Sequence, residues 1–344
     1  MMLRRGIFTV AVRAVVAIAV AAGALHPAPA DAQSKVSIGI GGYTFAFLPV
    51  LTADAAGLFK NEGLDVTLVQ TGGGANTMAA MIGGSVDAAG LVMSDIILAA
   101  SKGQRVTAFA PLMTQYASDA VVSKAAAVKA GLRTDMPLAE RLKRLKGMAL
   151  AISSRGSGTD KMWRYLLEQG GLDPDRDATL TVVKLDQMYP ALRASQIDGF
   201  NTSAPTNNRA VQEGLAVWAA RPSQGEIPGL ENFLYTVLGA KPDFLARNGD
   251  ITQKLVQALA KASQLIHSDP QRVAALIHES FFKQTDLALL EAAVADQRTA
   301  FAEHLTLTQS MYDQNMAFMT KFGEGVNSVK FSDVIEPKFV SALR

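Results

Sequence analysis

The residues best suited to hold another molecule form a small polar turn at 152–160, with the sequence I-S-S-R-G-S-G-T-D. The apolar run 148–152 predicts a short buried strand before the turn, and helical spacing resumes at 161–167. Glycine lets the backbone approach a guest closely, while Ser, Thr and Asp commonly cap a helix. The free N–H groups and the positive dipole end of that helix favour an anionic or strongly polar group. The turn therefore predicts a binding loop, with the candidate residues Ser154, Arg155, Gly156, Ser157, Gly158 and Thr159. A plain strand-to-helix turn would have the same composition.

Arg155 is the charged side chain inside this turn. A guanidinium forms paired hydrogen bonds to carboxylates and other oxyanions, and beside a helix N-terminus it would favour a negative ligand. The alternative is an arginine that faces solvent or pairs with a nearby aspartate. We therefore expect an organic anion as the first choice of ligand. A neutral aromatic or pyrimidine ring, stacked on Tyr43 or Phe45, is the second.

Further small polar loops follow predicted strands in the first half of the chain. The strand patterns are 36–40, 64–70 and 86–92, and the helical patterns after them are 48–59, 77–82 and a helix with Ser94 and Asp95 at its N-cap. Open α/β sheets bind ligands where the carboxyl ends of strands meet helix N-termini. We therefore expect ligand contacts from Tyr43, Thr44, Phe45, Gly73, Gly74, Asn76 and Ser94, although each could serve packing or capping alone. A dinucleotide fingerprint is excluded, because Thr44 stands where G-x-G-x-x-G needs its third glycine.

The second half repeats the alternation of strands and helices before it becomes helical. Strand patterns cover 106–112, 120–122, 179–185, 197–200 and 233–238, and helical patterns cover 188–194, 204–213, 251–267, 271–280, 287–301 and 308–322. This order fits a chain that leaves its first domain, builds a second and returns. We expect residues 33–115 and 237–344 to form lobe 1, and residues 116–236 to form lobe 2.

The N-terminal segment predicts export. Arg4 and Arg5 precede the apolar run 14–25, and A-x-A patterns at 28–30 and 30–32 predict signal cleavage near Ala30 to Gln33. The apolar run is shorter than the roughly 20 residues that a bilayer span needs. We therefore expect a cleaved signal peptide at 1–32 and a periplasmic protein that is not embedded in the membrane.

Composition excludes several classes of site. The chain contains no cysteine, which rules out a lipoprotein anchor, thiol nucleophiles and thiolate metal ligands. Residues 1–32 hold three arginines and one aspartate, and their removal from 33 basic and 31 acidic side chains leaves no net charge. No nucleic-acid partner is therefore expected.

Four motifs, in order along the chain, carry a family resemblance. They are A-D-A-A-G-L-F-K-N-E-G-L-D-V at 53–66, G-S-V-D-A-A at 84–89, L-K-G at 145–147 and A-L-R-A-S-Q-I-D-G at 191–199. From residue 36 onward the chain resembles the periplasmic solute-binding proteins of ABC importers that serve nitrate, sulfonates, taurine and thiamine-pyrimidine precursors. Many relatives carry a charged or aromatic residue before the proline of the segment N-T-S-A-P at 201–205. Here that segment predicts a hydroxyl-lined wall that includes Ser203.

The resemblance implies a two-lobed α/β fold of the type II periplasmic-binding-protein kind. Each lobe would be a mixed sheet flanked by helices, with the ligand cleft between the lobes. The function implied is capture of a small molecule, such as a sulfonate or carboxylate, and its delivery to an ABC permease and its ATPase. We expect a monomer that closes over its ligand and needs no cofactor or metal.

An enzyme or a ligand sensor on the same fold are the alternatives. The resemblance extends to a pyrimidine synthase that consumes its own histidine and carries a cysteine-rich motif. Here no cysteine is present, and His267, His278 and His304 lie in the helical tail, far in sequence from the polar loops. No nucleophile with an adjacent base stands out, so no catalytic residue is assigned. The sequence does not separate a sensor from a transport protein.

Overall fold

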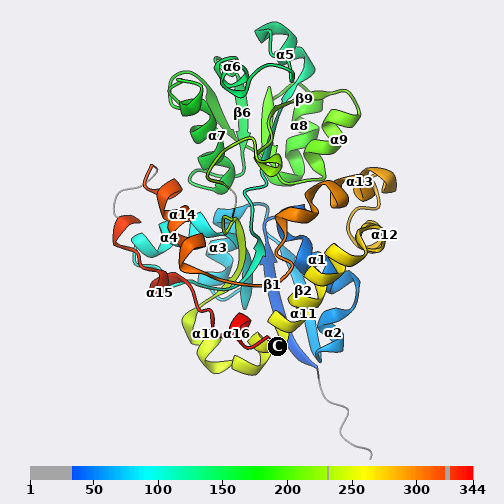
Figure 1. Cartoon of the computed structure of the whole chain (residues 1–344), viewed down its shortest axis with the longest axis vertical. Coiled ribbons are helices and arrows are strands. Elements are labelled where there is room, and N and C mark those ends of the chain that lie inside the picture. The colour runs from blue at the N-terminus through cyan, green and yellow to red at the C-terminus, as the bar shows by residue number, and fades with distance from the viewer. Residues whose placement is uncertain (1–32, 231, 322–325, 344) are drawn as a thin grey trace, which may run out of the picture. The chain divides into compact units, whose positions relative to one another are not determined.

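The computed structural model describes residues 33–230, 232–321 and 326–343. The predicted signal peptide lies outside the described residues, so its cleavage stays a prediction. Within the described ranges, no helix is long and apolar enough to cross a membrane. Two five-stranded sheets, each flanked by helices, organise the chain (Figure 1).

The first sheet has the strand order β2-β1-β3-β10-β4. β1 pairs in parallel with β2 and β3, whereas β10 runs antiparallel to β3 and β4. The sheet therefore gathers an early and a late part of the chain and is mixed. Its strands are β1 (Ser34–Ile40), β2 (Leu64–Gln70), β3 (Ala88–Val92), β4 (Thr107–Met113) and β10 (Thr236–Ala240).

The second sheet has the order β7-β6-β8-β5-β9. β6 is parallel to β7 and β8, and β5 is antiparallel to β8 and β9. The strands are β5 (Asp119–Ser123), β6 (Ala149–Ile152), β7 (Thr179–Val182), β8 (Gly199–Thr202) and β9 (Ala216–Ala220). The sequence patterns missed β9, and they carried β7 too far, because a 3₁₀ turn occupies Leu185–Gln187.

The helices fall into three groups along the chain (Figure 1). Between β1 and β4 lie α1 (Leu48–Ala55), α2 (Leu58–Asn61), α3 (Gly74–Ile82) and α4 (Met93–Ser101). Between β5 and β9 lie α5 (Lys124–Ala130), α6 (Leu138–Lys143), α7 (Gly158–Gln169), α8 (Met188–Arg193) and α9 (Thr206–Gln212). After β10 come α10 (Pro242–Arg247), α11 (Gly249–Ser268), α12 (Pro270–Ser280), α13 (Leu287–Gln297), α14 (Gln309–Met319), α15 (Phe331–Val334) and α16 (Lys338–Ser341). The late helix α11 packs against α1 and α2, which returns the chain to the first lobe.

Two helix starts differ from the predictions in ways that matter for the site. The helix predicted from residue 77 already begins at Gly74, so this glycine is helical. The helix predicted to be capped by Ser94 begins at Met93, after Val92, and has no side-chain cap. Ser94 therefore lies inside the first turn of α4, where its hydroxyl is available to another partner.

Two aspartates, one in each lobe, tie neighbouring strands together. Asp87 Oδ2 accepts hydrogen bonds from Ser37 N–H (2.8 Å) and Ser37 Oγ (2.7 Å), in the middle of the parallel neighbour β1. Asp198 Oδ2 accepts from Ala149 N–H (2.8 Å), the first residue of β6. The V-D-A and I-D-G motifs therefore fix strand register in both lobes, rather than capping their own turns.

An aromatic cluster lies where the chain passes between the sheets. Tyr116 packs against Phe233 and Tyr235, with ring centroids 5.3 and 4.4 Å apart. Its hydroxyl donates to the Gly158 carbonyl (2.9 Å), at the first residue of α7. The crossing segment thus holds the start of α7 in place through a buried hydrogen bond.

Asp119 begins β5 just after the crossing and is fully buried. Its carboxylate accepts hydrogen bonds from Ser223 N–H (2.9 Å) and Ser223 Oγ (2.6 Å), and Arg221 Nε lies 3.6 Å away. Burial raises the pKa of Asp119 to about 6, although Ser223 and Arg221 act in the opposite direction. The second lobe therefore contains a carboxyl group that titrates in the mildly acidic range.

This pKa predicts that the stabilising contribution of Asp119 is lost as the pH rises. The folded pKa lies above the ordinary value of 3.8, so that contribution is full below about pH 4 and disappears as the pH passes about 6. We expect the wild-type protein to lose about 1–3 kcal/mol of unfolding free energy over this interval, relative to Asp119→Asn. Urea unfolding of both proteins between pH 4 and 7 measures the difference. A difference that stays constant with pH would contradict the assignment.

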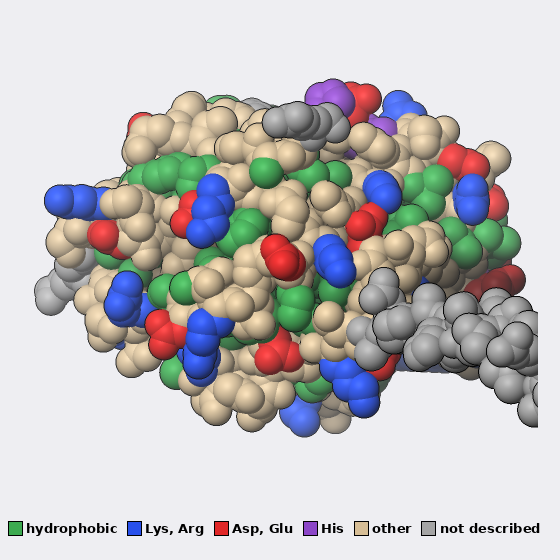
Figure 2. Space-filling view, turned by 90° about the horizontal axis from the view of Figure 1, so that it is seen from below, with side chains coloured by type: hydrophobic (Ala, Val, Ile, Leu, Met, Phe, Trp, Pro, Cys, Tyr) green, Lys and Arg blue, Asp and Glu red, His purple; other side chains and the backbone are tan. Residues whose placement is uncertain are grey.

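The surface carries mixed charge. Figure 2 shows Lys and Arg side chains interspersed with Asp and Glu on the face drawn there, without a field of one sign. This agrees with the balanced charge of residues 33–344. The face in view offers no basic patch of the kind that binds nucleic acid.

Candidate ligand-binding site

A small cavity of about 50 Å³, called here the central cavity, lies between residues of the two sheets. The first lobe lines it with the segments after β1 and β2 and with the β3–α4 junction. The second lobe lines it with the β6–α7 turn, with Leu185 of the 3₁₀ turn after β7 and with the end of β8. Polar side chains and glycines that line it include Thr44, Gly74, Asp95, Ser153, Ser157, Gly158, Thr159, Thr202, Ser203 and Tyr235. The cavity thus lies in the crevice where strand ends meet helix starts.

The β6–α7 turn supplies a cluster of three hydroxyl groups. Ser153 Oγ lies 3.1 Å from both Ser157 Oγ and Thr159 Oγ1, which are themselves 2.9 Å apart. Ser157 caps α7, since its hydroxyl accepts from Asp160 N–H. The predicted strand, cap and helix are therefore confirmed.

The first N–H groups of α7 also line this wall. The first hydrogen bond of the helix is donated by Lys161 N–H to the Ser157 carbonyl (2.9 Å), so the Gly158 and Thr159 N–H groups precede it. Such N–H groups have no partner within their own helix, and the helix dipole adds positive potential there. With hydroxyl hydrogens that can rotate, this wall can donate several hydrogen bonds to one oxyanion or carbonyl group.

A buried ion pair joins the lobes beside the cavity. Lys161 Nζ on α7 lies 2.8 Å from Asp95 Oδ1 and 3.2 Å from Ser94 Oγ, both on α4. The side chains of Lys161 and Asp95 are only 3% and 10% exposed. The pair is electrically balanced, so the central cavity carries little net charge, and it can form only when the two lobes are together.

The part of the lining that comes from the end of β8 and the start of β10 is also rich in hydroxyl groups. Ser203 Oγ donates to the Ala117 carbonyl (2.5 Å), and Thr202 lines the cavity beside it. Tyr235 contributes a phenol that hydrogen bonds with Ser203 and Ser118, and burial raises the pKa of Tyr235 to about 12. The phenol therefore stays protonated at neutral pH and offers a neutral polar group. The predicted hydroxyl-lined wall is present at the cavity.

Two outer cavities flank the central one. One, of about 370 Å³, shares Thr44 and Leu185 with it and is also lined by Tyr43. The other, of about 310 Å³, shares Gly74, Asp95 and Ser157 with it and is lined by Arg155 and Gly156. Together they extend the inter-lobe space on both sides.

Six of the predicted ligand residues line the central cavity, namely Thr44, Gly74, Ser157, Gly158, Thr159 and Ser203. Tyr43, Arg155 and Gly156 line only the outer cavities. The structure turns Arg155 outward: its side chain is exposed, and its guanidinium donates to the Leu180 carbonyl (2.8 Å). An anion in the central cavity is therefore not brought against this guanidinium.

The remaining predicted residues lie elsewhere. Phe45 is a fully buried core residue packed edge-on against Phe282, and Asn76 is exposed and donates to the Thr71 carbonyl (3.1 Å). Gly73 is buried, and a Cβ there would be 3.4 Å from the Ser153 carbonyl oxygen. The other two are Ser94, whose buried hydroxyl bonds Lys161 Nζ, and Ser154, whose buried hydroxyl has no hydrogen-bond partner in the described part of the chain.

Five polar residues at or beside the central cavity were not predicted from the sequence: Ser153, Asp95, Lys161, Thr202 and Tyr235. Ser153 and Thr202 adjoin predicted residues, so their neighbours were a usable signal. Asp95 was assigned only to a helix cap. Lys161 looked like an ordinary helix residue, because its pairing with Asp95 depends on how the lobes meet.

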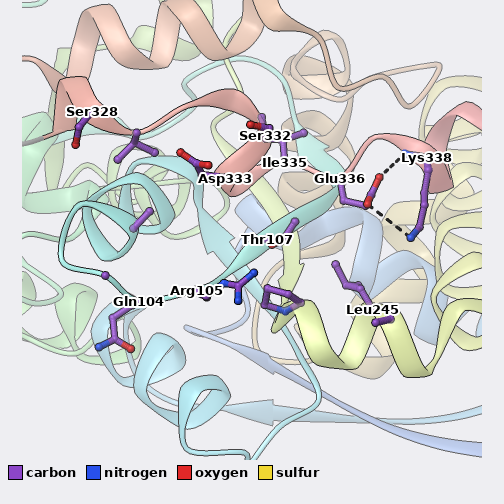
Figure 3. Close-up of a pocket in the computed structure, with 15 residues that line it drawn as sticks. Gln104, Arg105, Thr107, Leu245, Ser328, Ser332, Asp333, Ile335, Glu336 and Lys338 are labelled. Atoms are coloured by element: carbon purple, nitrogen blue, oxygen red, sulfur yellow. Dashed lines mark hydrogen bonds and ion pairs between the residues drawn. The ribbon is translucent and has the colours of Figure 1, made fainter.

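A larger cavity, of about 500 Å³, lies away from this site (Figure 3). It is lined by the α4–β4 loop, α10 and the C-terminal segment, and Glu336 and Lys338 form an ion pair at its edge. A guest there would touch the first lobe alone. It would not couple binding to contact between the lobes. We therefore place the candidate site in the central cavity.

Metal chemistry has no evident donor set. Among the residues that the structure describes, no group of three or more His, Cys, Asp or Glu side chains could hold a metal ion. The central cavity instead combines hydroxyl groups, helix N–H groups and one ion pair. These groups suit recognition of a small polar molecule.

The two sheets and the cavity between them define the fold class: a two-lobed α/β fold shared with solved structures of periplasmic binding proteins. A model of the NMT1-like family matches residues 30–278, and the chain belongs to this family. The resemblance inferred from the motifs and the predicted fold class are thereby confirmed.

Known relatives and solved structures agree on this class. The chain is 22% identical over 317 residues to YtlA of Bacillus subtilis (strain 168), a candidate binding protein, and 90% of each chain is covered. The alkanesulfonate-binding protein SsuA of Xanthomonas axonopodis pv. citri, solved bound to MOPS, has a TM-score of 0.70 at 20% identity, covering 86% of this chain and 95% of that one. The periplasmic nitrate-binding protein NrtA of Synechocystis PCC 6803 has a TM-score of 0.70 at 16% identity, covering 89% and 87%. These proteins are named as binding proteins rather than enzymes.

Proposed function

We propose that this protein is the extracytoplasmic solute-binding component of an ABC-type importer. It captures a small molecule between its lobes and delivers it to a permease and its ATPase. The observation that carries the proposal is the central cavity, whose polar lining comes from both lobes. A guest held by both walls stabilises the closed form alone, which is how a binding protein couples capture to a change of shape.

The proposed ligand is a small oxyanion, such as a carboxylate or sulfonate. The α7 wall offers the Gly158 and Thr159 N–H groups and the hydroxyls of Ser153 and Thr159 to one acceptor group, whereas the Ser157 hydroxyl donates to the Ser154 carbonyl (2.7 Å). Helix N-termini favour negative groups, and the small cavity fits a compact head group. The sulfonate and nitrate named for SsuA and NrtA belong to the same chemical class.

Organisation and location complete the proposal. Lobe 1 comprises residues 33–115 and 237–344, and lobe 2 comprises residues 116–236. The protein acts as a periplasmic monomer after removal of its signal peptide, and it has no catalytic activity of its own. The polar cavity lined by both lobes supports a role in binding.

The proposal predicts that ligand binding contracts the protein. Purified protein, unfolded and refolded to remove any bound molecule, would be screened against small carboxylates and sulfonates by thermal shift. A ligand at 100 times its Kd stabilises the fold by about 2.7 kcal/mol if it does not bind the unfolded chain. Small-angle scattering should then show a smaller radius of gyration with the best ligand. A tight ligand that leaves the radius unchanged would contradict closure, and its chemical conversion during incubation would favour an enzyme.

A further inference from the structure

One oxygen of the buried ion pair has no partner. Asp95 Oδ1 receives Lys161 Nζ, but Asp95 Oδ2 is buried and accepts no hydrogen bond within the described residues. The Asp95 side chain is 10% exposed and lines the central cavity. A buried carboxylate oxygen without a donor is costly, so such an oxygen points to a missing partner.

The start of α3 lies close to this oxygen. Gly74 begins α3 and lines the same cavity as Asp95. A Cβ atom at Gly74 would lie 2.7 Å from Asp95 Oδ2, closer than real Cβ contacts allow. Any other residue at 74 would therefore press on the carboxylate, so glycine is needed where α3 begins beside Oδ2.

The protein's own nearby cation is already engaged. Lys161 Nζ bonds both Asp95 Oδ1 and Ser94 Oγ. The free oxygen can only accept, so only a guest atom that donates a hydrogen satisfies it, and a guest acceptor beside it would be repelled. The α7 wall of the same cavity has the opposite preference, because it presents N–H and O–H donors.

We propose that the ligand carries an N–H or O–H donor in addition to its oxyanion group, and that Asp95 Oδ2 accepts this donor. This inference rests on the proposed function and narrows the ligand class. Amino- and hydroxy-substituted carboxylates or sulfonates and hydrogencarbonate meet the requirement. Nitrate and unsubstituted alkanesulfonates or alkanoates do not, because they have no hydrogen to donate. Asp95 is then the residue that selects among small oxyanions.

Matched pairs of probes test the proposal, since the members of a pair differ mainly in the donor. Suitable pairs are 2-aminoethanesulfonate with ethanesulfonate, β-alanine with propanoate, and hydrogencarbonate with nitrate. We expect calorimetry on the refolded protein to show at least tenfold tighter binding for the donor-bearing member of at least one pair. Equal affinities within every pair, or no binding by any probe, would overturn the proposal.

The double variant Asp95→Asn/Lys161→Met tests whether Asp95 is responsible. It removes both charges together and so avoids leaving a single buried ion. The donor preference should vanish in this variant, and Gly74→Ala, whose methyl group would crowd Oδ2, should reduce it. A preference that persists in both variants would overturn the assignment to Asp95. A ligand-bound structure in which an ordered water, rather than the ligand, donates to Asp95 Oδ2 would also overturn it.

The same experiments distinguish a failure of the proposed function from a failure of this inference. If a donor-free probe binds tightly and contracts the protein in scattering, the solute-binding function stands and the role of Asp95 is wrong. If donor-bearing probes bind through Asp95 without contraction, the selection by Asp95 stands and the closure mechanism is wrong.

Discussion

Thr159→Val should lower the free energy of unfolding by about 2–5 kcal/mol, although it conserves side-chain shape. Thr159 Oγ1 accepts the Ser153 N–H (2.8 Å) and completes the hydroxyl cluster with Ser153 Oγ and Ser157 Oγ. Valine would leave a largely buried N–H without an acceptor and remove two hydroxyl contacts. Each unsatisfied buried group costs about 1–3 kcal/mol. Urea unfolding measured by circular dichroism gives the change directly.

Thr159→Ser is the matched control for this prediction. It keeps the hydroxyl and removes only a methyl group, so its cost should be about 1 kcal/mol. Affinity for the best small oxyanion should follow the same order, with valine weaker than serine, because the same hydroxyl faces the central cavity. Equal stability of the valine variant and the wild type would mean that the cluster in the β6–α7 turn contributes little.

Local patterns were sufficient where the structure depends on local contacts. The bounds of β2 were predicted to the residue, and the β6–α7 turn was predicted as a strand, a turn with capping residue types and a helix, whose cap is Ser157. Apolar periodicity and capping chemistry act over a few residues, so a single sequence displays them. Both two-lobed organisation and the hydroxyl-lined wall followed from the order of these local elements and from the motifs.

Features that depend on contacts between residues far apart in the sequence could not be predicted from local patterns. Asp95 and Lys161 are 66 residues apart and meet only across the lobes. Arg155 could have faced the cavity or solvent, and the carbonyl of Leu180, a residue of β7, decides its direction. β9 is a five-residue edge strand with the sequence A-V-W-A-A, too short for its period to show. Pairing with β5 holds it as a strand, and that partner lies far away in the sequence.

The charge pattern of the site is the feature in which the structure differs most from the prediction. In the sequence, an arginine beside a predicted helix start suggested an anion held by its guanidinium. The structure instead combines helix N–H groups and hydroxyls on one side with a carboxylate oxygen on the other. Such a site recognises a pattern of donors and acceptors more than a net charge. Its selectivity should therefore depend less on ionic strength than that of a site built around an exposed arginine.

Gly158→Val should weaken binding of the best small oxyanion by about 5- to 150-fold, with little change in the unfolding free energy. A Cβ at Gly158 would lie 3.1 and 3.3 Å from the two methyl carbons of Val92, at the end of β3 in the first lobe. A branched side chain needs still more room. The closed form would be overpacked, whereas the open form would accept valine at the start of α7.

Gly249→Val is the matched control, because Gly249 also begins a helix and a Cβ there meets nothing within 4 Å. The affinity of the Gly249→Val variant for the best small oxyanion should equal that of the wild type. Arg155→Ala should also bind within about twofold of the wild type, since its guanidinium bonds the Leu180 carbonyl outside the central cavity. Calorimetry on the three variants, with urea unfolding as a check on the fold, separates the outcomes. Wild-type affinity in a well-folded Gly158→Val protein would place the ligand away from the α7 N-terminus, because closure around that wall could not then be required for binding.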